Sequence, residues 1–216
     1  NDSLKIKSII ENKEKITVIG SGYIGLEIAA IARKKGVQVT IIEMAETVMS
    51  RSLCYETSRF FQEKHEKEGV KFLFNSSVVN IKDHGNEKII TTNHNCKIKT
   101  DAIVIGIGIK PNIELAINSG IEWDNGILVD QNGQTSDKNI FAAGDCTNHP
   151  NNIYNRRFRL ESVHNAIEQA KTVASTIIGK YKPYQKVPWF WSDQYNLKLQ
   201  IAGISDSYDN YFLKGK

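Results

Sequence analysis

The sequence predicts an α/β fold built on a parallel sheet, with a segment of short antiparallel strands added to it. The runs KITVIG at 15–20 and VQVTIIE at 37–43 are rich in β-branched residues, as buried strands are. Between them, from Tyr23 to Lys35, apolar residues recur at helical spacing, and Gly36 supplies a stop. Strand, helix and strand in this order form a βαβ unit, whose two strands lie parallel in one sheet.

The remaining elements follow from the same patterns. Two more helices are expected, from Leu53 to Glu68 and from Glu161 to Ile178, each followed by a glycine. The expected strands are KFLFN (71–75), VVNIK (78–82), KIITT (88–92), KIKT (97–100), DAIVIGIG (101–108), NIFAAGD (139–145), PWFWSDQY (188–195) and LKLQIAGI (197–204). GILVD at 126–130 begins another segment. Turn formers separate the three strands between 78 and 100, which predicts an antiparallel meander.

Composition excludes several classes of protein. The 216 residues are 40% hydrophobic and 24% charged, as in a soluble globular protein. The net charge of +4 is too weak to indicate a nucleic-acid partner, although it suits an acidic protein partner. Cys54, Cys96 and Cys146 contain no C-x-x-C pair, which argues against a zinc site or a disulfide framework and fits the reducing cytoplasm. The histidines show no metal-ligand spacing, and no apolar run is long enough for a membrane span.

The sequence GSGYIG at 20–25, hereafter the fingerprint loop, matches the pattern G-x-G-x-x-G. It follows a predicted strand and opens a predicted helix, which is the context of a dinucleotide-binding site. In that context Gly20 permits a tight turn, Gly22 lets a pyrophosphate approach the backbone, and Gly25 lets helix and strand pack closely. The helix N-terminus then offers N–H groups and a partial positive charge to the phosphates.

Glu43 ends the second strand about 20 residues beyond the fingerprint loop. A carboxylate there accepts hydrogen bonds from the ribose hydroxyls of NAD and repels the 2′-phosphate of NADP. Met44 and Ala45 follow it and provide no cation for that phosphate, so the sequence predicts NAD(H). Arg51 lies further along, where it is either a solvated arginine at a helix start or a residue near the nucleotide.

Residues 139–146, NIFAAGDC, place Asp145 on a tight turn after an apolar run. By chemistry alone, a turn or helix-cap aspartate is as consistent with this pattern as a ligand-binding one. The motifs taken together are more specific: KITVIGSGYIGLE, the spacing from Glu43 to Arg51, GIGIKPN, NIFAAGDC, RLESVHNAIEQA and VPWFWSDQY. They resemble the FAD-dependent pyridine nucleotide-disulphide oxidoreductases, and most closely their ferredoxin, rubredoxin and putidaredoxin reductase group.

This resemblance implies a domain organisation. A Rossmann-like NAD(H)-binding domain over residues 1–110 would be inserted in an FAD-binding domain, both doubly wound, with 111–184 forming the C-terminal part of the latter. Residues 185–216 would begin an α+β C-terminal domain that is truncated here. The glycine motif that grips the FAD adenosine in whole members of the family is missing. The resemblance therefore predicts a fragment that binds NADH but holds FAD poorly.

The resemblance also implies site residues. Glu27 would lie near the nicotinamide and Trp191 against the flavin ring, although a solvated glutamate and a core tryptophan are the alternatives. The implied NAD-binding residues are Gly20, Gly22, Tyr23, Ile24, Gly25, Glu27, Glu43, Arg51, Gly106, Ile107 and Gly108. The implied FAD-binding residues are Gly144, Asp145, Glu161, Ser162, Val163 and Trp191. The helix beginning near Glu161 would stabilise negative charge on the reduced flavin.

The implied reaction passes a hydride from NADH to flavin N5 and then single electrons to a small acidic iron–sulfur protein, a ferredoxin or rubredoxin. Arg156, Arg157 and Arg159 form a basic cluster that is either a docking patch for this partner or a solvated loop. The alternatives are a flavoenzyme with another acceptor, of the nitrite reductase or monodehydroascorbate reductase type, and an NAD-binding protein like apoptosis-inducing factor.

Overall fold

The computed structural model describes residues 2–205 and 208–215, which form two compact units. The first unit comprises the described residues up to Gly108, the segment Ser192–Leu199, and the described residues from Ser205 onward. The second unit comprises Ile109–Trp191 and Gln200–Ile204. No helix in the described part of the chain has the length and apolar character needed to cross a membrane.

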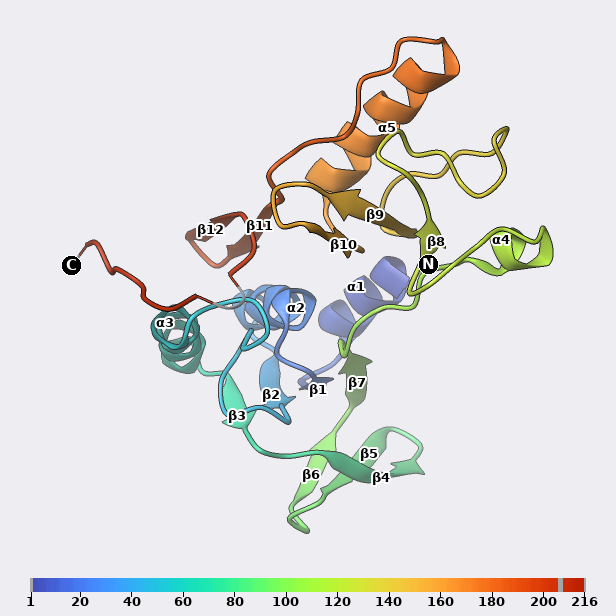
Figure 1. Ribbon diagram of the computed structural model, residues 1–216. Helices are drawn as coiled ribbons and strands as arrows, with labels where there is room; N and C mark the ends of the chain where they lie inside the picture. Colours follow the sequence, from blue (N-terminus) through green and yellow to red (C-terminus); the bar gives the residue numbers. More distant parts are fainter. Residues whose placement is uncertain (1, 206–207, 216) are drawn as a thin grey trace. The chain divides into compact units, whose positions relative to one another are not determined.

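A four-stranded parallel sheet in the order β3-β2-β1-β7 forms the centre of the first unit (Figure 1). Its strands are β1 (Lys15–Ile19), β2 (Gln38–Ile42), β3 (Lys71–Leu73) and β7 (Ala102–Ile105). The helices of this unit are α1 (Asp2–Asn12), α2 (Tyr23–Lys34) and α3 (Tyr55–Lys67). The βαβ unit predicted from residues 15–43 is therefore confirmed as β1, α2 and β2.

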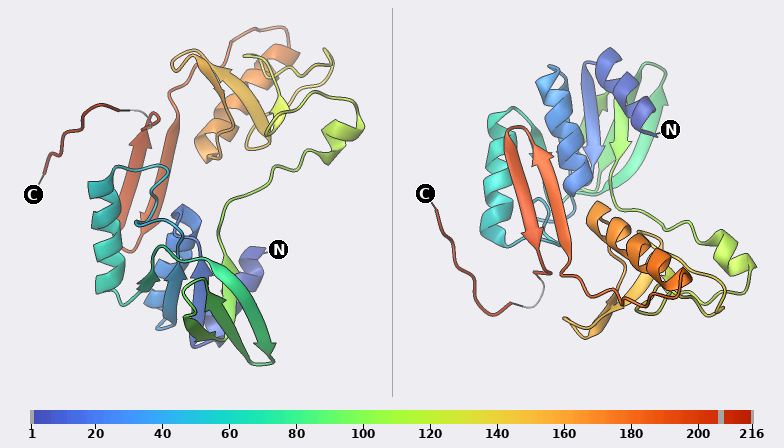
Figure 2. Two further views of the ribbon diagram at one scale, coloured as in Figure 1. Left: turned by 60° about the horizontal axis from the view of Figure 1, so that its bottom comes forward. Right: turned by 90° about the horizontal axis from the view of Figure 1, so that it is seen from above.

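The predicted meander is a separate antiparallel sheet in the order β4-β5-β6. Its strands are β4 (Val78–His84), β5 (Glu87–Thr92) and β6 (Lys97–Thr100). It lies on the side of the parallel sheet away from α2 (Figures 1 and 2). The connection from β3 to β7 thus passes through this sheet, while helices make the other crossovers.

The core of the first unit lies between the parallel sheet and its helices. Ile16 and Val18 of β1, Leu26 of α2 and Ile41 of β2 are at most 1% exposed. Burying each such aliphatic side chain stabilises the fold by about 1.5–3 kcal/mol. Leu197 and Leu199 pack against the same core from the C-terminal hairpin. Figure 2 shows this hairpin as two neighbouring arrows pointing in opposite directions, β11 (Trp189–Gln194) and β12 (Leu197–Ala202).

The second unit contains a three-stranded sheet in the order β10-β9-β8 and two helices. The β8–β9 pair is parallel and the β9–β10 pair antiparallel. The elements are α4 (Glu114–Asn118), β8 (Ile127–Leu128), β9 (Thr147–Asn151), β10 (Arg156–Phe158) and α5 (Val163–Ile177).

One expectation in the second unit is wrong. Residues 139–145 do not form a strand: Phe141 makes an isolated bridge to Gln134, and the strand β9 begins only at Thr147. The chain turns at Gly144, whose φ is +89°, and the Thr147 N–H donates to the Gly144 carbonyl. In the segment that begins at Gly126, only Ile127 and Leu128 form a strand, and the Asp130 carboxylate accepts from the Asn132 and Gln134 N–H groups in the turn that follows.

Candidate dinucleotide site

The fingerprint loop lies where the strand order of the parallel sheet reverses. From β1 the chain proceeds through α2 to β2 and β3 on one side, whereas β7 pairs with the other side of β1. Gly20 follows β1 directly and Gly106 follows β7, so both loops leave the same carboxyl edge. In open α/β sheets this switch point is where ligands bind.

Three glycines bring three backbones into contact at this edge. Gly20 has φ of +97°, and a Cβ there would lie 2.4 Å from the Gly106 carbonyl oxygen. A Cβ on Gly25 would lie 2.3 Å from the Gly20 carbonyl oxygen, and one on Gly106 would lie 3.6 Å from the Gly25 Cα. Side chains at Gly20 and Gly25 would therefore displace backbone. The tight turn and the close helix–strand packing inferred from the motif are both present.

Gly22 differs from these glycines. It precedes α2 with φ of −71°, and a Cβ there would meet no atom of the described residues within 4 Å. In the part of the chain that the structure describes, no side chain caps this end of α2. The first N–H groups of a helix lack intrahelical partners and carry partial positive charge, so the open space at Gly22 adjoins an anion-binding end. This open space lies at Gly22, where the glycine motif predicts that a pyrophosphate approaches the backbone.

Glu43, half-buried just after β2, is held by the fingerprint loop. One carboxylate oxygen accepts hydrogen bonds from the Ser21 N–H at 2.7 Å and the Ser21 hydroxyl at 2.8 Å. The other accepts one from the Ala45 N–H at 2.9 Å. Burial raises the pKa of Glu43, but these hydrogen bonds outweigh it and hold the pKa below its usual value. The group is thus an anion at neutral pH, and it retains capacity to accept from a ribose hydroxyl.

Apolar side chains surround the loop and are exposed. Ile24 at the start of α2 is 59% exposed, Met44 beside Glu43 is 75% exposed, and Ile107 after β7 is 69% exposed. Exposed apolar groups around a few fixed polar ones are typical of a ligand site. Arg51 is also exposed, whereas Tyr23 packs against the core and burial raises its pKa.

Glu27 lies on α2, two residues beyond the fingerprint loop. Its Oε1 atom accepts a hydrogen bond from the Ser192 hydroxyl at 2.5 Å. Ser192 belongs to β11 and is fully buried. Glu27 is therefore not simply the solvated helix glutamate that the sequence left as an alternative. The hairpin residue that binds it was not predicted.

The turn at Gly144 and Asp145 in the second unit is tied to α5. Gln169 of α5 accepts hydrogen bonds from the Gly144 N–H at 2.7 Å and the Thr147 hydroxyl at 2.8 Å. Asp145 itself is exposed. Gln169 is a structural partner of this turn that the sequence analysis missed, because nothing in its local pattern distinguishes it from other polar residues on the helix.

The N-terminus of α5 is formed as a capped helix start. Ser162 is the N-cap, and its hydroxyl accepts from the Asn165 N–H at 3.1 Å. The helix begins at Val163, two residues later than predicted, and Val163 is exposed. Glu161, just before this helix start, is also exposed. The exposed N-terminus of α5 fits one part of a flavin site, because the helix dipole favours negative charge there. Glu161 pairs with Arg159 at 2.5 Å in the same segment.

The three predicted docking arginines have different surroundings. Arg157 donates to the Val129 carbonyl at 2.7 Å and to the Asn148 carbonyl at 2.5 Å, so it ties β10 to the neighbouring strands. Arg159 is mostly buried and pairs with Glu161. The guanidinium of Arg156 lies 4.5 Å from the Phe158 ring centroid, and Arg156 is exposed. All three thus make contacts within their own unit, which neither sequence alternative included. Trp191 is 41% exposed.

The chain matches two family models. Residues 2–170 match the pyridine nucleotide-disulphide oxidoreductase model, and residues 189–216 match the reductase C-terminal model. Among curated proteins, rhodocoxin reductase from Rhodococcus erythropolis is 42% identical over 97% of this chain and 49% of its own length. Putidaredoxin reductase from Pseudomonas putida is 37% identical over 93% of this chain and 48% of its own. The chain spans about half the length of the curated relatives it matches.

Solved structures agree with these matches. The ferredoxin reductase of the CYP199A2 system from Rhodopseudomonas palustris superimposes with a TM-score of 0.95 at 37% identity, over 99% of this chain and 53% of that one. The reductase in the covalent putidaredoxin reductase–putidaredoxin complex gives 0.93 at 35% identity, over 100% and 52%. The fold and the family expected from the motifs are confirmed. This chain belongs to the pyridine nucleotide-disulphide oxidoreductase family, and its relatives are ferredoxin, rubredoxin and putidaredoxin reductases.

Proposed function

We propose that the chain binds NAD(H) at the fingerprint loop as part of an FAD-dependent reductase in the cytoplasm that passes electrons to a small acidic iron–sulfur protein. The Glu43 carboxylate carries this proposal, because it is an anion held beside the loop at the switch point of the sheet. It favours ribose hydroxyls over a 2′-phosphate. The division into 1–110 for NAD(H), 111–184 for FAD and 185–216 for the C-terminal domain belongs to the same proposal.

Each group of residues has a distinct task in this function. Gly22 and the start of α2 bind the pyrophosphate, Glu43 binds the adenine ribose, and Glu27 with the Gly106–Gly108 segment lies at the nicotinamide. Gly144, Asp145, Trp191 and the Glu161–Val163 segment contribute to the FAD site. When bound, FAD supplies the redox chemistry, accepting hydride from NADH and yielding electrons singly to the iron–sulfur acceptor. Arg156 offers positive charge to an acidic partner.

Two measurements test this function. Calorimetric titration of the chain should show NADH binding at least tenfold more tightly than NADPH, and Glu43→Gln should reduce this preference because the repelling charge is lost. Glu46→Gln, at an exposed carboxylate nearby in the sequence, is the control and should leave the preference unchanged. In the FAD-loaded reductase of which this chain is proposed to be part, NADH without oxygen should bleach the flavin band, and a ferredoxin should restore it. Equal affinity for both nucleotides contradicts the proposal.

A further inference from the structure

A network of polar side chains leads from Glu27 into the interior of the first unit. The Ser192 hydroxyl lies 2.5 Å from Glu27 Oε1 and 3.0 Å from Gln194 Nε2. Gln194 Oε1 lies 2.9 Å from His65 Nε2, and His65 Nδ1 lies 3.3 Å from the Tyr195 hydroxyl. Ser192, Gln194 and His65 are each at most 1% exposed. We call these five residues the polar network.

The direction of every hydrogen bond in the polar network follows from its end at a carboxylate. An ionised carboxylate only accepts, so Ser192 donates to Glu27 and in turn accepts from the Gln194 amide nitrogen. The Gln194 amide oxygen accepts from His65 Nε2, which leaves Nδ1 to accept from the Tyr195 hydroxyl. The second amide N–H of Gln194 faces Met49, with 3.8 Å between Gln194 Nε2 and Met49 Sδ. Burial lowers the pKa of His65 more than the Gln194 hydrogen bond raises it, so a neutral imidazole fits this arrangement.

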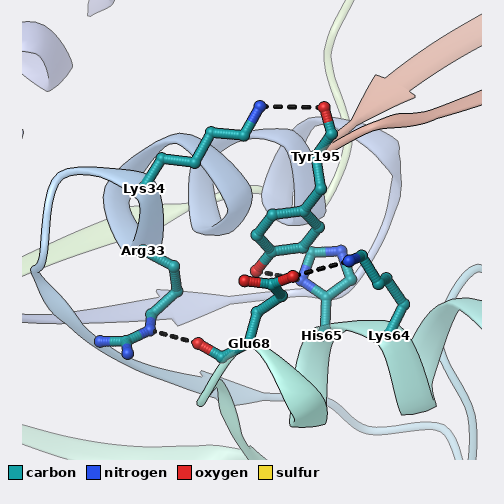
Figure 3. Close-up of polar contacts among 6 residues, drawn as sticks. All are labelled: Arg33, Lys34, Lys64, His65, Glu68 and Tyr195. Atoms are coloured by element: carbon teal, nitrogen blue, oxygen red, sulfur yellow. Dashed lines mark hydrogen bonds and ion pairs between the residues drawn. The ribbon is translucent and has the colours of Figure 1, made fainter.

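The far end of the polar network is fixed at the hairpin turn between β11 and β12 (Figure 3). Lys34 of α2 donates to the Tyr195 carbonyl at 2.9 Å. The Lys64 ammonium lies 5.3 Å from the Tyr195 ring centroid and pairs with Glu68 at 2.6 Å. The turn is thus held by α2 and α3, the helices that also carry Glu27 and His65. A buried network with every member hydrogen-bonded holds its groups in a unique geometry.

We propose that Ser192 is a positioning residue, supported by Gln194 and His65, that fixes the Glu27 carboxylate so that it accepts from the carboxamide of the nicotinamide. The proposal rests on the proposed function, which places the nicotinamide at Glu27. Ser192 occupies Oε1 in the described part of the chain, which leaves Oε2 as the acceptor for a ligand. The carboxamide carries an N–H₂ donor, which a carboxylate oriented in this way accepts. Without Ser192, the glutamate side chain would sample several rotamers and bind this group less well.

The test compares NADH with ADP-ribose, which lacks the nicotinamide, by titration calorimetry on the full 216-residue chain. Ser192→Ala should weaken NADH binding about tenfold, as loss of a hydrogen bond to a charged group does, and change ADP-ribose affinity less than twofold. The control is Ser58→Ala, because Ser58 is also fully buried in this unit and its hydroxyl has no hydrogen-bond partner among the described residues. This control should change neither affinity.

A double-mutant cycle separates positioning from general disruption. Glu27→Ala and the combination of Glu27→Ala with Ser192→Ala should each weaken NADH about tenfold, because Ser192 acts only through Glu27. Additive losses, or equal losses for NADH and ADP-ribose, would overturn the proposal. If Ser192→Ala does not fold, Ser192→Cys, similar in size and a weak donor, takes its place with the same expected outcomes. A wild-type chain that binds neither ligand refutes the proposed function, whereas intact NADH binding by Ser192→Ala refutes only this inference.

Discussion

Two glutamates of the first unit, Glu43 and Glu27, are each held by a serine, but over very different distances along the chain. Ser21, which holds Glu43, lies 22 residues away within the fingerprint loop. Ser192, which holds Glu27, lies 165 residues away in the C-terminal hairpin. The end of the site assigned to the adenine ribose is therefore complete within one βαβ unit. The end assigned to the nicotinamide depends on a distant segment.

This difference has a consequence for stability and binding. Changes in the fingerprint loop should disturb the fold and both ends of the nucleotide, because three backbones meet there. Changes in the polar network should disturb the nicotinamide end and leave ADP-ribose binding intact, because Ser21 and Glu43 do not depend on the hairpin.

The largest effect is expected in the fingerprint loop. Gly20→Ala should lower the free energy of unfolding by about 3 kcal/mol or more, because it strains a positive φ and forces Cβ against the Gly106 carbonyl. Gly22→Ala, the matched control, meets open space and should cost less than about 1 kcal/mol while still weakening NADH binding. Urea unfolding measures the first quantity and calorimetric titration the second. A destabilised Gly22→Ala, or a Gly20→Ala variant as stable as wild type, would contradict the close-packed loop.

A smaller loss of stability is expected in the polar network. Gln194→Leu keeps a side chain of similar size but leaves the His65 Nε2–H and the Ser192 hydroxyl without their buried partner. Its free energy of unfolding should fall by about 2 kcal/mol. Ser58→Ala in α3 should change it by less than about 0.5 kcal/mol, because no hydrogen bond is lost in the described part of the structure. Chemical unfolding of both variants measures this contrast. Equal losses in the free energy of unfolding would mean that the hydrogen bonds of the polar network contribute no stability beyond that of burial.

The smallest effect is expected in the free energy of unfolding at acidic pH, through Glu43. Since the pKa of folded Glu43 lies below its usual 4.5, its contribution to stability is present above pH 4.5 and is lost as pH falls through the folded pKa. The unfolding free energy of wild type should therefore fall relative to that of Glu43→Gln below pH 4.5, by less than about 1 kcal/mol for this half-exposed group. Unfolding curves at several pH values would show it. A wild type that gains stability relative to the variant on acidification would contradict the assigned hydrogen bonds.

Sequence reasoning succeeded where the determinants are local. The βαβ unit and the close packing at Gly20 and Gly25 arise within 30 residues of sequence, so local spacing determines this geometry. It failed at residues 139–145, where an apolar run reads as a strand but turns at Gly144 before it can pair. The true strand β9, TNHPN, is polar and contains a proline, so no β pattern identifies it.

The polar network could not be predicted for a different reason. Ser192, Gln194 and His65 have ordinary local patterns, and their roles arise only when the hairpin packs beside α2 and α3. Arg157 is similar. The arginines at 156, 157 and 159 suggest a surface cluster, whereas Arg157 binds the Asn148 carbonyl in the adjacent strand β9 and the Val129 carbonyl just after β8. Ser192 and Gln194 alternate along β11 and so share one face of it, and the structure buries that face.

A crystal structure of the chain with NADH would show directly how the nucleotide lies along the fingerprint loop. We expect the pyrophosphate at Gly22 and the start of α2, and an adenine ribose hydroxyl within hydrogen-bonding distance of Glu43. The carboxamide should lie beside Glu27, with Ser192 still bound to the other carboxylate oxygen. A nucleotide lying away from the fingerprint loop, or one with its nicotinamide at Glu43 and its adenine at Glu27, would contradict the account.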